Sequence, residues 1–137
     1  MFIDIKEKIT NPEILNILAA CVFDNSDKGM AKKAEEYKQH EEWLFYGWQE
    51  NEKIVGVCGY KVHPAKIEIL SIATSTEAQG QGIGSRMIIA LQEKYNLPLE
   101  AETDDDAIGF YKKRGFATTP FEKHGVRRWT CLLPVNI

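Results

Sequence analysis

The sequence has few cysteines, no long apolar run and no excess of positive charge. Its three cysteines, Cys21, Cys58 and Cys131, are an odd number without a secretory signal, which indicates reduced thiols and a cytoplasmic protein. No apolar segment approaches the length that spans a membrane, so a membrane partner is not expected. The formal net charge of −3 argues against a nucleic-acid partner, because nucleic-acid binders usually carry a basic field.

The length and the order of predicted elements favour a single α+β domain over residues 1–137 with a mixed, mostly antiparallel central sheet. A strand–helix–strand unit over residues 66–102 predicts one local parallel pair, and the remaining strands suit antiparallel pairing. The predicted strands are 2–6, 43–48, 54–62, 66–73, 97–102, 116–119 and 126–133. The predicted helices are 12–24, 29–40, 82–95 and a segment capped by Thr103 that ends at Arg114.

A glycine-rich run, Gln79-Gly80-Gln81-Gly82-Ile83-Gly84-Ser85, stands between a predicted strand and a predicted helix. Such a run removes side chains from a helix N-terminus, so that several backbone N–H groups point at one place. The helix dipole adds partial positive charge there. The run therefore predicts a site for a phosphate or diphosphate group.

Several ligands fit a glycine-rich helix start. A dinucleotide-binding loop would carry glycine where Met87 stands and would follow its strand directly, whereas Ser75 to Ala78 intervene. Glu102 lies near the place of a ribose-binding acid, so this alternative stays open. A P-loop would need Gly-Lys-Ser/Thr, which is missing. A glycine-rich helix start without a ligand also stays open.

Two motifs resemble those of the GNAT superfamily of acetyl-CoA-dependent N-acetyltransferases. The run from Glu68 to Thr74 followed by Gln79-x-x-Gly82-x-Gly84 is similar to the acyl-CoA-binding motif of that family. A second signature follows at the usual distance, Ala107-Ile108-x-Phe110-Tyr111-x-x-x-Gly115-Phe116. The resemblance covers roughly residues 42–119, and it implies a sheet with helices on both faces.

The resemblance implies acetyl-CoA as cosubstrate and assigns its contacts. The diphosphate would bind the loop amides, and pantetheine would follow the strand at Ile72 to Thr74, where the neighbouring strand must diverge to free backbone groups. The cofactor-binding residues are then Ile72, Ala73, Thr74, Gln79, Gly80, Gln81, Gly82, Ile83, Gly84 and Ser85. An amide near Ala73 is a candidate oxyanion donor. No metal is expected, because His40, His63 and His124 lack metal-ligand spacing.

The resemblance also implies two catalytic residues. Glu68 lies eleven residues before Gln79, where some family members carry a general base, and strand alternation predicts that it shares a face with Leu70 and Ile72. Its alternative is a solvated glutamate. Tyr111 falls at the position of the family's general acid, and its alternative is a core tyrosine. Cys58 and Cys131 have no base beside them in the sequence, which favours direct attack over a covalent intermediate.

The predicted function is transfer of an acetyl group from acetyl-CoA to a primary amine in a ternary complex. The alternative is a non-catalytic acyl-CoA-binding sensor or interaction module. The acceptor, a small-molecule or peptide amine, is expected to contact the helices of residues 11–40 and the loop 119–125. The protein is expected to be a monomer or homodimer, with the strand 126–133 as a candidate dimer edge.

Overall fold

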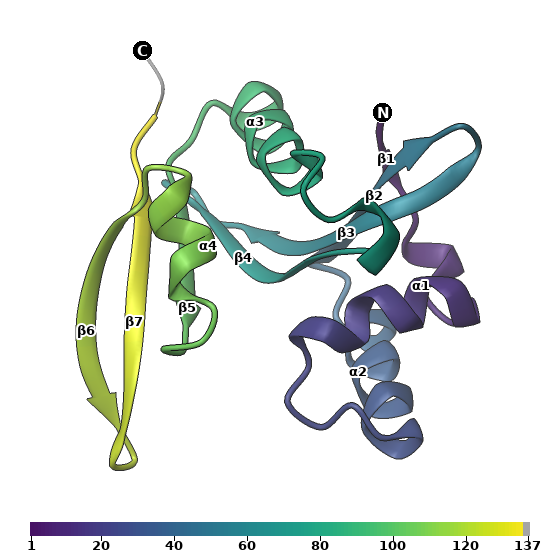
Figure 1. The fold of residues 1–137 in the computed structure, drawn as a ribbon, viewed down its shortest axis with the longest axis horizontal. Coiled ribbons are helices and arrows are strands. Elements are labelled where there is room, and N and C mark those ends of the chain that lie inside the picture. The colour runs from purple at the N-terminus through teal and green to yellow at the C-terminus, as the bar shows by residue number, and fades with distance from the viewer. Residues whose placement is uncertain (136–137) are drawn as a thin grey trace.

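Seven strands form one sheet in the order β1-β2-β3-β4-β5-β7-β6 (Figure 1). The computed structural model describes residues 1–135. Only β4 and β5 are parallel, and the other neighbours are antiparallel, which confirms the predicted mixed, mostly antiparallel α+β sheet. The strands are β1 (Phe2–Asp4), β2 (Trp43–Glu50), β3 (Lys53–Val62), β4 (Ile67–Thr74), β5 (Leu99–Thr103), β6 (Ala117–Lys123) and β7 (Val126–Leu133).

Helices cover both faces of the sheet, as predicted (Figure 1). The α-helices are α1 (Pro12–Leu18), α2 (Asp27–Gln39), α3 (Ile83–Tyr95) and α4 (Ile108–Lys113), and the short 3-10 helices are η1 (Lys6–Lys8), η2 (Ala19–Cys21) and η3 (Thr76–Ala78). One apolar core packs α1 and α2 against β2 and β3. The other packs α3 and α4 against the opposite face. No helix in residues 1–135 combines the length and the apolar character needed to cross a bilayer.

Three helix boundaries differ from the predictions, and in two of them a side chain caps the helix at another residue. The first helix ends at Leu18 and tightens into η2. α2 begins at Asp27, since the Ser26 hydroxyl accepts the Gly29 amide at 3.1 Å. Thr103 belongs to β5 and caps no helix. The Asp104 carboxylate accepts the Ala107 amide at 2.9 Å instead, and α4 starts one residue later.

The two parallel strands separate after a short paired segment. β4 and β5 are paired only from Ile67–Leu99 to Ile69–Ala101. Beyond that point the side of β4 that faces β5 has no strand partner, so its backbone groups are available to a ligand. This confirms the predicted divergence beside residues 72–74.

A bulge in β4 reverses the predicted orientation of one residue. Gly59 of β3 pairs with Ser71 and the next residue, Tyr60, pairs with Ile69, so Leu70 is the extra residue. Leu70 packs with the α1–α2 core and Ile72 with the α3–α4 core. The prediction that Ile72 shares a face with Glu68 and Leu70 is therefore wrong, because simple alternation does not continue through a bulge.

The strand β7 lies inside the sheet. It pairs with β5 on one side and with β6 on the other, and the edges are β1 and β6. The prediction that residues 126–133 form a free edge for dimerisation is therefore wrong. The sequence alone did not indicate that the last hairpin inserts its second strand next to β5.

Gly59→Ala should destabilise the fold. A β-carbon at Gly59 would collide with the ring and hydroxyl of Tyr37, which is fully buried and donates to Ser71 at 2.9 Å. We expect a loss of about 1–3 kcal/mol in the free energy of unfolding, measured by chemical denaturation. Gly109→Ala on α4 is the matched control, because nothing lies within 4 Å of its added carbon. Equal stability of the two variants would contradict the packing described here.

Candidate active site

Two glycines with left-handed backbones shape the loop that precedes α3. Gly80 has φ +85° and Gly82 has φ +78°. Glycine adopts these angles without steric cost. No other atom lies within 4 Å of the place where a β-carbon would stand at either residue. The backbone of this loop is therefore open to a ligand.

Four consecutive amides at the start of α3 are free donors. They are the N–H groups of Gly82, Ile83, Gly84 and Ser85. None of them donates to a backbone carbonyl within residues 1–135, and the first helical bond runs from Arg86 N to Gly82 O at 3.0 Å. The N-cap, Gly82, has no side chain that could accept. Unsatisfied amides at the positive end of a helix are suited to bind an anion.

Two other loop residues use their amides within the protein. Gln79 N donates to Thr76 O at 3.4 Å, and Gln81 N donates to Ala78 O at 3.3 Å. The amides of Gln79 and Gln81 are therefore not available to a ligand, and the predicted amide cluster contains fewer residues than the glycine-rich motif. Of the predicted cofactor-binding residues, Gln81 alone does not line the cavity described below.

Gly84 has a different role from Gly80 and Gly82. A β-carbon at Gly84 would lie 2.6 Å from the ring of Phe110 and 3.1 Å from Nη2 of Arg114. The missing side chain thus allows α4 to approach the first turn of α3. The Arg114 guanidinium lies 3.6 Å from the centroid of the Phe110 ring and donates to the Phe110 carbonyl at 2.8 Å. Its buried Nε has no partner within residues 1–135.

A cavity of about 440 Å³, the glycine-loop cavity, opens at this helix end. All the predicted cofactor-binding residues except Gln81 line it, together with Ala78, Phe110, Lys113 and Arg114. Two cationic side chains thus stand beside four free amides. The combination favours a ligand with more than one negative charge.

A second cavity of about 610 Å³, the Tyr111 cavity, adjoins the first. Its walls come from residues 20–23, from residues 70–72 of β4, from residues 102–104 and 106–107, from Phe110 and Tyr111 of α4, and from Arg128 of β7. Ile72 and Phe110 line both cavities. The two cavities therefore meet where β4 parts from β5. The predicted acceptor loop 119–125 does not line the Tyr111 cavity, whereas residues 20–23 of the predicted segment 11–40 do.

Tyr111 belongs both to the core and to the wall of this cavity. Only 7% of the residue is exposed, and its ring packs edge-to-face on Phe110 and Phe116. Its hydroxyl makes no hydrogen bond within residues 1–135. Burial, and to a lesser extent the thiols of Cys58 and Cys131, raises the pKa of Tyr111 above its ordinary value. The hydroxyl is therefore protonated at physiological pH and free to donate.

Glu68 lies outside both cavities. Its side chain is 40% exposed, and its Oε1 lies 2.8 Å from Nε2 of His63. Leu70, two residues further along β4 on the same face, lines the Tyr111 cavity. Glu68 and Tyr111 are thus not brought together by direct contact. The assignment of Glu68 as a base stays a prediction, and it requires water between the carboxylate and the reacting group.

Cys21 is the one cysteine in the Tyr111 cavity among residues 1–135. Much of the residue is accessible, but its thiol lies against Ser71 and Ile72. The loss of water there raises the pKa of the thiol to about 11. Burial also raises the pKa of the thiols of Cys58 and Cys131. None of these thiols is activated as a nucleophile.

Sequence reasoning missed the acidic wall of the Tyr111 cavity, formed by Glu102, Asp104 and Asp106. The loop that carries it is fixed to β7. Arg127 donates from Nε and Nη2 to the two oxygens of Asp105, both at 2.9 Å, and Trp129 Nε1 donates to Asp105 at 2.7 Å. These hydrogen bonds lower the pKa of Asp105. The four acidic residues within positions 102–106 were the sequence signal that could have indicated this wall.

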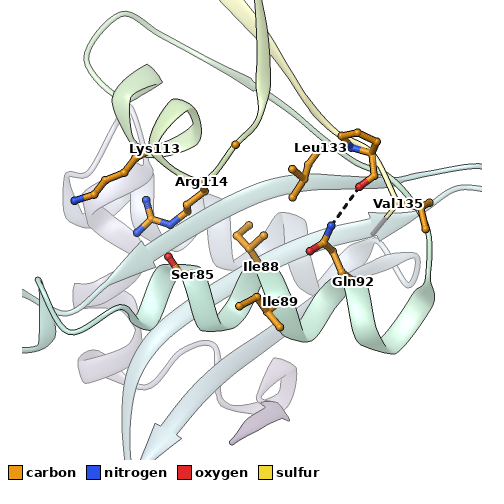
Figure 2. Close-up of a pocket in the computed structure, with 10 residues that line it drawn as sticks. Ser85, Ile88, Ile89, Gln92, Lys113, Arg114, Leu133 and Val135 are labelled. Carbon is orange, nitrogen blue, oxygen red and sulfur yellow. Dashed lines mark hydrogen bonds between the residues drawn. The ribbon is translucent and has the colours of Figure 1, made fainter. Parts of the chain in front are cut away.

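A groove between α3 and β7 continues from the glycine-loop cavity (Figure 2). The two share Ser85, Lys113 and Arg114. In Figure 2, the two cationic side chains lie at one end of the groove and Gln92 lies at the other, where its amide donates to Pro134 O at 3.3 Å. The floor between the ends is apolar. Within residues 1–135, no group of His, Cys, Asp and Glu side chains is placed to hold a metal ion.

Comparison with known families identifies this arrangement. The model of the acetyltransferase (GNAT) family matches residues 11–116. The chain belongs to the GNAT family. As a GNAT member the protein is an acyltransferase, and the motifs named in the sequence lie in the matched region. No curated protein sequence matches the chain.

Solved structures share the GNAT fold over almost the whole chain. An IAA acetyltransferase from Bacillus cereus is 20% identical, covering 98% of this chain and 99% of that one with a TM-score of 0.69. An aminoglycoside 6'-N-acetyltransferase complexed with coenzyme A is 12% identical, covering 100% and 98% with a TM-score of 0.75. The ribosomal-protein-S18-alanine N-acetyltransferase from Escherichia coli is 17% identical, covering 100% and 94% with a TM-score of 0.67.

Proposed function

We propose that this protein transfers an acetyl group from acetyl-CoA to a primary amine by direct attack in a ternary complex. The supporting observation is the meeting of two cavities at Ile72, where β4 has left β5. One cavity presents free amides and cations, and the other presents the unpaired hydroxyl of Tyr111 and carboxylates. A phosphorylated donor and a cationic acceptor can therefore occupy opposite sides of one opening.

The glycine-loop cavity suits the diphosphate of the donor. The amides from Gly82 to Ser85 would donate to its oxygens, and Lys113 and Arg114 would balance its charge. Backbone groups of Ile72 to Thr74 would bind pantetheine along the free side of β4, and the Ala73 amide is a candidate oxyanion donor. The groove beyond Arg114 would accept the nucleotide part (Figure 2).

When bound, the donor supplies an acetyl thioester, and side chains of the protein would accept and donate the protons that move during the transfer. An alkylamine has a pKa of about 10.4 and is mostly protonated at pH 7, so it must lose a proton before it attacks. Glu68, hydrogen-bonded to His63, would accept that proton through water. As the C–N bond forms and the C–S bond breaks, the Tyr111 hydroxyl would donate to the leaving sulfur. The high pKa of the Cys21 thiol favours this direct route over an acetyl-cysteine intermediate.

The acceptor is proposed to be a small-molecule or peptide amine, and the location cytoplasmic, as three free cysteines fit a reducing compartment. The assay is thiol release from acetyl-CoA in the presence of a panel of primary amines, with acetylated products identified by mass spectrometry. An enzyme releases thiol in step with product. Binding of acetyl-CoA without thiol release above background for any amine would instead support the non-catalytic acyl-CoA-binding sensor.

Gly82→Glu should abolish donor binding. The new carboxylate would stand in the glycine-loop cavity and repel the diphosphate, and we expect the affinity for acetyl-CoA to fall at least a hundredfold by calorimetry. Gly125→Glu is the matched control. It adds the same charge at a similar backbone angle, φ +76°, in the β6–β7 turn away from both cavities. Unchanged affinity in Gly82→Glu would refute the diphosphate assignment.

Tyr111→Phe should lower kcat by roughly 10²- to 10³-fold, because the leaving sulfur would lose its proton donor. The affinity for acetyl-CoA should stay within twofold. Since the pKa of Tyr111 is raised, the hydroxyl stays protonated across pH 6–9, and the loss should be the same at every pH in that range. The control is Tyr46→Phe on β2, outside both cavities. Wild-type turnover in Tyr111→Phe would remove this residue from the mechanism.

A further inference from the structure

We propose that the acceptor carries a second cationic group, separate from the amine that is acetylated, and that Asp106 binds this group at the rim of the Tyr111 cavity. The inference rests on the proposed function and names the substrate class of the same site. It places the two cationic groups of the acceptor at different depths, one beside Tyr111 and the other beside Asp106.

The charges on the cavity wall are unbalanced. Three carboxylates line it, from Glu102, Asp104 and Asp106, against the single guanidinium of Arg128. Arg128 Nε donates to Glu102 at 3.1 Å, and Lys123 Nζ lies 3.7 Å from the same carboxylate. Glu102 is therefore already neutralised. The remaining negative charge comes from the two aspartates.

The two aspartates differ in what they already bind. Asp104 accepts the Ala107 amide at 2.9 Å and is committed to the start of α4. Asp106 is exposed and makes no ion pair or side-chain hydrogen bond within residues 1–135. Its neighbour Asp105 is held by Arg127 and Trp129, which fixes the loop to β7. Asp106 is thus a free carboxylate on a backbone that is held in place.

The hydroxyl of Tyr111 is an independent indication that a ligand enters this cavity. Only 7% of Tyr111 is exposed, and the residue lines the cavity. Its hydroxyl has no hydrogen-bond partner within residues 1–135. Within residues 1–135, Arg114 Nε is the one fully buried side-chain N or O atom without a partner, so the Tyr111 oxygen is accessible and free to bind a ligand in the cavity. The reacting amine therefore belongs at the buried end, near Tyr111 and Ile72.

The wall also offers apolar surface for the part of the acceptor that joins the two cationic groups. Leu70 contributes from β4, and Val22 and Phe23 contribute from the segment after η2. The Phe23 side chain is fully exposed. Apolar surface beside carboxylates suits a methylene chain with an ammonium group at each end. A monoamine of the same length would leave Asp106 without a partner.

The test compares 1,6-diaminohexane with hexylamine as acceptors of the full-length protein. The diamine has a twofold statistical advantage, and we expect its kcat/KM to exceed that of hexylamine at least tenfold. Asp106→Asn should lower kcat/KM for the diamine about three- to tenfold through KM, with kcat and the hexylamine reaction within twofold of wild type. The matched control is Glu122→Gln, an exposed carboxylate on β6 outside the cavity.

Salt provides a second readout. The preference for the diamine should shrink in 0.5 M sodium chloride, because the contact with Asp106 is exposed to solvent. Equal kcat/KM for the two acceptors after the statistical correction would overturn the inference. So would a diamine preference that Asp106→Asn leaves intact or that Glu122→Gln reduces equally.

Direct binding separates this inference from the proposed function. Calorimetry measures the affinity of 1,6-diaminohexane for wild type, Asp106→Asn and Glu122→Gln in the presence of coenzyme A. Diamine binding that depends on Asp106 without any acetyl transfer would support the second cationic site and refute the enzyme. Acetyl transfer without diamine binding that depends on Asp106 would support the enzyme and refute the site.

Discussion

The separation of β4 from β5 after Ile69 and Ala101 is the constraint on which the rest of the structure depends. A parallel pair in the interior of a sheet normally satisfies its backbone groups along its whole length. Here β4 runs on without that partner, and two cavities meet beside it, both lined by Ile72 of β4 and Phe110 of α4. The opening joins the free amides at the start of α3 to the cavity lined by Tyr111, so that the two cavities form one continuous space.

The close approach of α3 and α4 holds that opening in shape. Gly84 lacks the side chain that would push Phe110 away, and Phe110 in turn carries the guanidinium of Arg114 on its face. The same aromatic residue lines both cavities. Packing between two helices thus fixes the wall between the two cavities and the position of a cation beside the free amides.

The sequence predicted the class, the order of strands in the chain and the divergence of two of them, because these follow from periodicity and from two specific motifs. It did not predict the bulge at Leu70, since β4 contains no glycine that would mark one, and therefore misplaced Ile72. The position of β7 depends on pairing between distant segments. The charged wall was missed because local sequence did not show that Arg127 and Trp129 would hold Asp105 and leave Asp106 free.

The hydrogen bond from Tyr37 to Ser71 joins α2 to β4 directly after the bulge. This tie attaches α2 to β4 through buried side chains, and Val22 packs on the same core, whereas Ala20 and Phe23 are exposed. A change at Ala20 or Phe23 would therefore alter one wall of the Tyr111 cavity and leave the buried contacts of β4 in place. This wall and the buried face of β4 are thus held by different contacts within one small domain.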